Sequence, residues 1–172
     1  MSCNHVVNPA LWGKKREANG VMQWLPLAQH LEDTRNVIGQ LWDHWLSDGQ
    51  RRLIESSLSK HVDAKKLSQF LGCVHDIGKA TPVFQFRKSF SHSEDLDIEL
   101  KNKLATVGFT NIDYFIDKPE GWSSSHHTIT GQFILSNAGV PEGICAIVGA
   151  HHGKPLDNDS VCKSNKSKYP DN

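Results

Sequence analysis

The chain has 172 residues, of which 38% are hydrophobic and 22% charged, and its formal net charge at pH 7 is zero. This length predicts one domain with its own core, and the balanced charge argues against a protein that grips nucleic acid over its whole surface. There is no apolar run of about 18 residues and no pattern typical of a secretory signal, so we expect a cytoplasmic protein without a membrane segment.

The N-terminal third contains one strong helical signal. Residues 1–23 are polar and interrupted by Pro9, Gly13 and Gly20, which predicts an irregular lead-in, and strand signals are poor throughout the chain. From residue 27 to about 46, apolar positions recur at alternating steps of four and three, which predicts a long amphipathic helix. Its apolar stripe consists of Leu27, Leu31, Thr34, Ile38, Leu41 and Trp45. Asp48 and Gly49 are expected to end this helix, and a shorter helix is expected over about 50–59.

The next helix leads to a histidine–aspartate pair. Its apolar face is formed by positions spaced i, i+3, i+4 and i+7, and Asp63 is its expected N-cap. Gly78 is the expected stop, which places His75 and Asp76 on the last turn. The apolar positions are Leu67, Phe70, Leu71 and Val74. Of the four cysteines, Cys73 and Cys145 lie in apolar helical patterns and are expected to be buried free thiols.

The C-terminal half predicts three further helices and a polar end. A short aromatic segment and a polar loop come first, and irregular sequence separates the first of these helices from the second. The helices are expected over 96–107, 126–137 and 142–151. Ser123, Ser124 and Ser125 offer N-caps for the second helix, and Gly139 and Pro141 make the turn before the third. We divide the chain into a domain over 1–155 and a polar, disordered or truncated tail over 156–172.

Several of the ten histidines fall at helix ends or beside apolar faces. Taken singly, each one is more often a core residue, a helix cap or a partner of the helix dipole than a metal ligand. Taken together, their convergence on helix termini favours a shared site. These residues are His30, His75, His127, His151 and His152, with Asp76 beside them. His44, His61 and His92 lack this placement and are expected at the surface, and His5 is left unassigned.

Imidazoles and a carboxylate together suit a divalent transition metal. Because a carboxylate can bridge two ions and an imidazole cannot, Asp76 is the natural centre of a paired site. Two ions about 3.5–4 Å apart could hold the attacking and leaving oxygens of a phosphodiester. The set would accept Mn²⁺, Fe²⁺, Co²⁺, Ni²⁺ or Zn²⁺, whereas Mg²⁺ prefers oxygen ligands. Lys79 follows the pair, either as a phosphate contact or as a solvated lysine after a helix stop.

Support for nucleic-acid binding is local. Lys14 belongs to a short basic run that is either a contact for DNA or a solvated face, and similar basic pairs occur elsewhere. Trp12 and Trp122 lie outside the helical stripes, so they are candidates for stacking on unpaired bases, although loop aromatics that complete a core are equally common.

Three motifs resemble the HD phosphohydrolase superfamily, and more narrowly the HD nuclease domain of the CRISPR-associated helicase–nuclease of type I systems, subtype I-E. They are His75-Asp76-Ile77-Gly78-Lys79 with Phe84-Gln85 downstream, His127-Thr128-Ile129-Thr130-Gly131, and Gly149-Ala150-His151-His152-Gly153. The opening sequences Leu11-Trp12-Gly13-Lys14 and Pro26-Leu27-Ala28-Gln29-His30-Leu31 resemble that domain as well.

The resemblance implies an all-α fold, a compact helical bundle of the HD type with a metal site at converging helix ends. It implies one or two divalent ions and cleavage of single-stranded DNA that a helicase domain or subunit feeds in after an RNA-guided surveillance complex has opened the target. Asp76 and Lys79 would be catalytic, with Lys79 as a phosphate contact. Trp12 and Lys14 are added as substrate contacts on the local signals described above, not on the resemblance. The metal ligands would be His75, Asp76, His127, His151 and His152, with His30 as a ligand or its neighbour. His127 is preferred to His126 because its spacing to Gly131 fits the family.

The sequence departs from the family pattern at its C-terminal end. The family continues to a further aspartate ligand and a helicase domain, whereas here Asp157 and Asp159 lie in a polar tail that ends at Asn172. We therefore expect a fragment, a split-gene product or a truncated relative in which one metal position is weakened. Two other functions stay open at this point: an HD phosphohydrolase that acts on nucleotides, and a non-catalytic domain that binds the surveillance complex.

Overall fold

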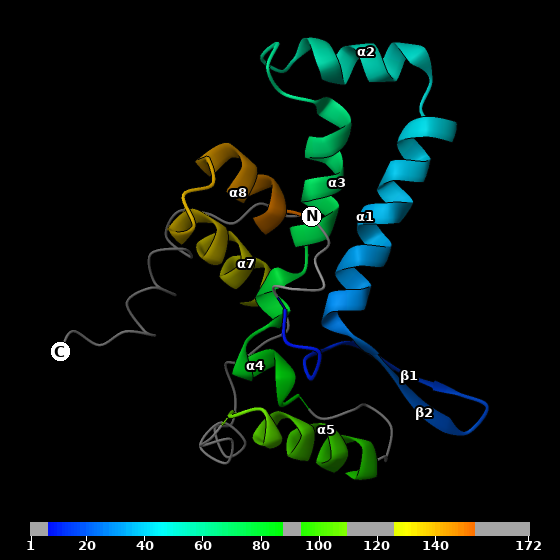
Figure 1. Ribbon diagram of the computed structural model, residues 1–172, viewed down its shortest axis with the longest axis vertical. Coiled ribbons are helices and arrows are strands. Elements are labelled where there is room, and N and C mark those ends of the chain that lie inside the picture. Colours follow the sequence, from blue (N-terminus) through cyan, green and yellow to red (C-terminus); the bar gives the residue numbers. More distant parts are fainter. Residues whose placement is uncertain (1–6, 88–93, 110–125, 154–172) are drawn as a thin grey trace, which may run out of the picture.

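Figure 1 shows the computed structural model of the chain, which describes residues 7–87, 94–109 and 126–153. These residues form helices and one two-stranded sheet. The elements are β1 (Trp12–Ala18), β2 (Val21–Pro26), α1 (Leu27–His44), α2 (Asp48–Ser56), α3 (Ala64–Val74), the 3₁₀ helix η2 (Ile77–Lys79), α4 (Pro82–Gln85), α5 (Glu94–Thr106), α7 (His126–Asn137) and α8 (Glu142–Gly149). Within the described ranges, no helix combines the length and the apolar character that crossing a membrane requires.

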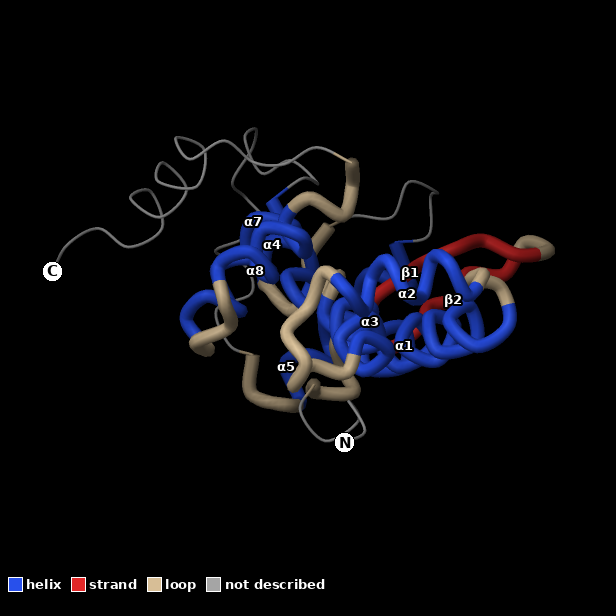
Figure 2. The backbone as a smooth tube through the Cα atoms, turned by 90° about the horizontal axis from the view of Figure 1, so that it is seen from above, coloured by secondary structure: helices blue, strands red, loops and turns tan. Residues whose placement is uncertain are grey.

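The all-α expectation is wrong between residues 12 and 26, where the predicted irregular lead-in forms an antiparallel β-hairpin (Figure 2). Ala18 pairs with Val21, which leaves Asn19 and Gly20 as the two-residue turn. Both have positive φ, 54° and 74°, as a type I′ turn requires. An Asn-Gly pair between two extended segments is a strong hairpin signal, and reading Gly20 only as a breaker overlooked it.

The long amphipathic helix is confirmed as α1, which begins at the residue after Pro26. Its first turns are buried, with Leu27 and Leu31 at 0% and 1% exposure. The predicted stripe does not stay buried along the helix, because Leu41 is 43% exposed and Trp45 72% exposed. The predicted stripe is therefore buried near the hairpin and exposed at its C-terminal end, where Trp42, which lies outside the stripe, is the buried side chain instead.

The expected boundary after α1 is wrong, whereas the expected start of α3 is confirmed. Asp48 and Gly49 do not end a helix but lie in the first turn of α2, where Ser47 and Gln50 form a reciprocal capping box. In α3 the predicted N-cap is confirmed, since the Asp63 carboxylate accepts a hydrogen bond from the backbone of Lys66 at 3.0 Å.

The end of α3 comes before the predicted stop at Gly78. The helix ends at Val74, and the backbone leaves helical geometry at Asp76, where φ is −108° and ψ is 16°. Residues Ile77–Lys79 then continue as η2. His75 and Asp76 thus lie just past the last turn of α3 rather than on it.

The three C-terminal helices are confirmed. α7 has the predicted bounds, α5 runs close to them, and α8 ends at Gly149, so that His151 and His152 follow the helix. The turn before α8 contains Gly139, whose φ is 78°. The serine caps before α7, the segment 110–121 and the boundary at residue 155 lie outside the described residues.

The elements pack so that several chain segments meet at one end of the molecule. α1 and α3 run side by side with α2 across their far end, and α7 packs on both α8 and η2 (Figure 1). One core cluster joins the start of α1 to α5, and a second joins β1, α4 and α5. A third lies between α7 and α8 and extends to Val74 and Ile77. These clusters surround the connection between α3 and α4, which carries Asp76.

The two cysteines in helices differ in state. Cys145 is a buried free thiol, as expected. Cys73 takes part in a disulfide, so the expectation of a free thiol there is wrong.

The buried end of α1 carries the stability of the helix. Replacing Leu31 with alanine removes a side chain that is 1% exposed, and we expect a loss of about 2–5 kcal/mol in the free energy of unfolding. The same change at Leu53, which is 71% exposed on α2, should alter it by about 0.5 kcal/mol or less. Urea denaturation followed by circular dichroism measures both, and equal losses in the two variants would contradict this packing.

Candidate metal centre

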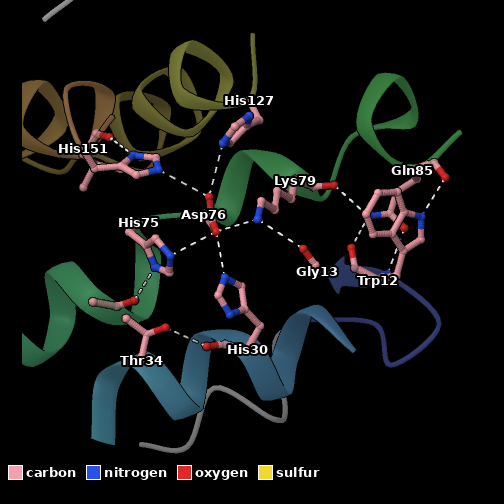
Figure 3. A network of polar contacts seen from close by, with 12 residues as sticks. Trp12, Gly13, His30, Thr34, His75, Asp76, Lys79, Gln85, His127 and His151 are labelled. Carbon is pink, nitrogen blue, oxygen red and sulfur yellow. Dashed lines mark hydrogen bonds and ion pairs between the residues drawn. The ribbon is translucent and has the colours of Figure 1, made fainter. Parts of the chain in front are cut away.

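Asp76 lies at the centre of the converging elements and is only 4% exposed (Figure 3). It lies two residues after the end of α3 and immediately before η2, so its carboxylate leaves the α3 axis toward α1, α7 and α8. Each of its two oxygens faces its own set of nitrogen atoms. A lone buried carboxylate is unfavourable unless it is paired, and these nitrogens supply the pairing.

The Oδ2 atom of Asp76 is contacted by three groups. Nε2 of His30, from α1, lies 2.7 Å away in a hydrogen bond, and Nε2 of His75 lies 3.0 Å away. The ammonium of Lys79, from η2, forms an ion pair with the same oxygen at 2.7 Å. His30 and Asp76 are 46 residues apart in sequence, so α1 and the α3 end bring together ligands that no local motif connects.

The Oδ1 atom faces the histidines of the C-terminal helices. Nε2 of His127, from α7, lies 3.3 Å from it, and Nε2 of His151, after α8, lies 3.4 Å from it. The His152 ring adjoins both, with centroid distances of 4.9 Å to His127 and 4.4 Å to His151. Ligand atoms of Asp76 and these three histidines lie within 4.8 Å of one another, and those of His30, His75 and Asp76 form a second such group.

The hydrogen-bond partner of Nδ1 fixes the tautomer of His75 and of His151. Nδ1 of His75 lies 2.8 Å from the carbonyl of Gly72, and Nδ1 of His151 lies 2.7 Å from the carbonyl of Val148. A carbonyl only accepts hydrogen bonds, so each Nδ1 carries the hydrogen. In the neutral ring Nε2 is then an acceptor.

Two acceptors therefore face each other on the Oδ1 side. Among the described residues, Asp76 Oδ1 and His151 Nε2 are buried without a hydrogen bond. Lone pairs of a carboxylate and an imidazole repel unless a positive charge lies between them. A proton or a metal cation between the two atoms would remove this repulsion. Metal-binding histidines commonly donate Nδ1–H to a backbone carbonyl, as His75 and His151 do here.

The electrostatics agree with a centre that holds positive charge. Burial alone would raise the pKa of the Asp76 carboxyl, but the surrounding imidazoles, those of His127 and His151 most strongly, hold that pKa far below its ordinary value. Burial opposes protonation of His151, yet Asp76 and the Val148 carbonyl together raise its pKa above 6.5. Burial and the neighbouring imidazoles lower the pKa of His152.

A glycine contact sets the distance between Asp76 and α7. A Cβ on Gly78 would overlap the carbonyl oxygen of His127 and lie 2.6 Å from the amide nitrogen of Gly131. Because position 78 has no side chain, η2 packs directly on the α7 backbone, which brings His127 to the carboxylate. Gly78 thus serves close approach rather than the helix stop that the sequence suggested.

The sequence profile of the family described as "Cas3, HD domain" matches residues 12–172. The chain belongs to this family. It is 50% identical over 171 residues to the "CRISPR-associated nuclease/helicase Cas3" of Streptococcus thermophilus, and the match covers 96% of this chain but 18% of that relative. No solved structure matched the chain.

All five histidines predicted as family ligands, together with Asp76, lie within this one cluster. The exposed positions of His44 and His61 agree with their expected surface placement. His5, His92 and the side chain of His126 lie outside the described residues, as do Trp122, Asp157 and Asp159. Metal ligation itself stays a prediction, because the donors fit a divalent ion without demonstrating one.

The predicted stacking of Trp12 on DNA bases is wrong, because the indole is 6% exposed and packs 4.5 Å from the Phe84 ring. Trp12 instead forms a buried clamp with Gln85, a residue to which sequence reasoning assigned no role. The Gln85 amide bonds both backbone groups of Trp12, and Trp12 Nε1 donates to the Gln85 carbonyl at 2.8 Å. Lys14, two residues further along β1, is exposed as a substrate contact would have to be.

A methyl group at Gly78 should separate η2 from α7. We expect Gly78→Ala to lower the free energy of unfolding by about 1–3 kcal/mol or more, because the clash is with backbone atoms. Gly143→Ala is the matched control, since a Cβ there meets no atom within 4 Å, and it should leave stability unchanged or raise it by up to about 1 kcal/mol. Thermal or urea denaturation compares the two, and a neutral Gly78→Ala would refute the direct backbone contact.

Proton and metal should compete at His151. Because its folded pKa is raised above 6.5, protonation begins at a higher pH than in a free imidazole. Divalent-ion affinity should therefore be full well above that pKa and fall as the pH drops through it, starting above about 6.5. Calorimetric titration with Mn²⁺ between pH 8 and pH 5 measures this dependence. An affinity that stays flat across the range would be incompatible with histidine ligation.

Proposed function

We propose that this chain is a metal-dependent nuclease domain that cleaves single-stranded DNA in CRISPR interference. The observation that carries the proposal is the pair of buried acceptor atoms, Asp76 Oδ1 and His151 Nε2, that face each other in a cluster of five imidazoles. Membership of the Cas3 HD-domain family supports the assignment, and the name of the Streptococcus thermophilus relative is that of a nuclease and helicase.

The donor set favours one or two ions with Asp76 between them. His127, His151 and His152 would serve an ion on the Oδ1 side, and His30 and His75 an ion on the Oδ2 side. So many imidazoles suit Mn²⁺, Fe²⁺, Co²⁺, Ni²⁺ or Zn²⁺ better than Mg²⁺, which prefers oxygen ligands. When bound, such ions supply Lewis-acid activation of water and of the phosphodiester.

The protein's own groups position the reactants. Asp76 holds both halves of the centre together, and the carbonyl-anchored rings of His75 and His151 present Nε2 in a fixed direction. The ammonium of Lys79 is paired with Asp76 Oδ2, and once released from that pairing it could meet a phosphate oxygen as a point charge. Lys14, exposed on β1, is proposed as a backbone contact for the strand, with an affinity that falls as salt rises.

The proposed partners follow from the family and are not contacts seen here. The relative's name includes a helicase, and this chain matches 18% of its length. We propose that a helicase, in the same polypeptide or another, supplies the single strand, and that an RNA-guided surveillance complex opens the target. The I-E subtype and the cytoplasmic location stay predictions.

Replacing Asp76 with asparagine keeps its shape and removes the bridging charge. Loss of partners outside the ligand set costs about 10–100-fold in activity or metal affinity, so loss of the central ligand should lower cleavage at least about 100-fold. The assay is cleavage of circular single-stranded DNA with Mn²⁺, together with metal analysis of the purified protein. Asp33→Asn, on the exposed face of α1, is the control and should cleave like the wild type.

Other results would redirect the assignment. Full activity of Asp76→Asn with no effect of chelator would exclude this centre as the site of cleavage. Hydrolysis of a nucleotide panel without DNA cleavage would favour an HD phosphohydrolase. Bound metal without any hydrolysis, together with capture of the surveillance complex, would favour a non-catalytic binding domain.

A further inference from the structure

The two oxygens of Asp76 are unequally provided with positive charge. Oδ2 has an ammonium at 2.7 Å, and it also accepts a hydrogen bond from His30. Oδ1 makes no hydrogen bond to any described residue and faces the imidazoles of His127 and His151 at 3.3 and 3.4 Å. One side of the carboxylate therefore already holds a cation that belongs to the protein, and the other side does not.

The ammonium of Lys79 is held in place rather than solvated. Its side chain is 12% exposed, and Nζ also donates to the carbonyl of Gly13 at 3.1 Å. The Lys79 backbone is fixed as well, since its carbonyl accepts from the Gln85 amide at 2.8 Å. Gln85 is clamped in turn to Trp12, the neighbour of Gly13. The same clamp thus positions both the lysine and the carbonyl that binds it (Figure 3).

We infer that Lys79 occupies the cation position on the Oδ2 side, so that divalent ions load the centre in a set order. The first ion enters beside Oδ1, between His127, His151 and His152. The second enters beside Oδ2, between His30 and His75, and it displaces the Lys79 ammonium because a divalent ion and an ammonium at contact distance from the same oxygen repel each other strongly in a buried site. This inference rests on the metal binding of the proposed function and assigns Lys79 a role within it.

Displacement links metal loading to substrate contact. While Lys79 is paired with Oδ2, its ammonium is committed to the protein. Once the second ion holds Oδ2, the ammonium is released at the edge of the cluster, where it can bind a phosphate oxygen of the DNA strand. Lys79 is therefore a positioning residue for the metals and a substrate contact only in the fully loaded centre.

Calorimetric titration of the full chain with Mn²⁺ tests the order of loading. The wild type should show one tight binding site and one weak binding site, each for a single Mn²⁺ ion. Lys79→Met removes the competing charge and should narrow the ratio of the two dissociation constants about tenfold or more, which corresponds to about 1.4 kcal/mol. Lys60→Met, an exposed lysine at the far end of the bundle, is the matched control and should leave the ratio unchanged.

Two further variants assign the two binding sites to their ligands. His152→Gln removes an exposed ligand of the Oδ1 group and should remove the tight site. His75→Asn keeps an amide near the position of Nδ1, within reach of the Gly72 carbonyl, but lacks Nε2, so it should remove the weak site alone. Loss of the tight site in His75→Asn, or an unchanged ratio in Lys79→Met, would overturn the inference.

The binding readout separates this inference from the proposed nuclease activity. Ordered loading in a protein that does not cleave single-stranded DNA would support the role of Lys79 and contradict the nuclease. Cleavage of single-stranded DNA by a protein whose two sites bind Mn²⁺ equally tightly would support the nuclease and contradict the role of Lys79.

Discussion

The structure depends on a single buried carboxylate that has to be neutralised. Asp76 is 4% exposed and receives nitrogen ligands from α1, from the end of α3, from η2, from α7 and from the segment after α8. A buried charge without partners costs several kcal/mol, so these elements can fold together only if their nitrogens reach it or a cation does. The need to neutralise Asp76 therefore brings these elements together and also gathers the nitrogens that could bind a metal.

Backbone groups, rather than side-chain packing, give the centre its precision. His75 and His151 are each oriented by a carbonyl from the last turn of their own helix. Gly78 lets η2 rest on the α7 backbone, and Gly13 offers both a carbonyl to Lys79 and the space for β1 to approach His30. Carbonyl and glycine positions are fixed by the main chain, so the rings that they orient lose little further entropy when a ligand arrives.

Sequence reasoning succeeded where a periodic pattern or a motif was present. The 3.6-residue periodicity located α1, and the HD, HTITG and HHG motifs with the opening match at His30 identified the histidines that the structure brings together. It missed the hairpin because Asn19-Gly20 was treated as a break instead of a type I′ turn, and with it the burial of Trp12. It could not supply the Trp12–Gln85 clamp or the division of ligands between two oxygens, because both depend on contacts between residues far apart in sequence. The disulfide of Cys73 left no spacing signal at all.

The absence of buried residues from α2 has a consequence for how the molecule opens. Leu27 and Leu31 anchor the turns of α1 that carry His30, and Trp42 is buried near the end of that helix, whereas α2 contributes no buried side chain. Regions with few buried apolar contacts unfold locally at low free-energy cost, while well-packed turns open only with the whole domain. α2 should therefore open locally and exchange its amide hydrogens early, and this opening would leave the N-terminal turns of α1 undisturbed.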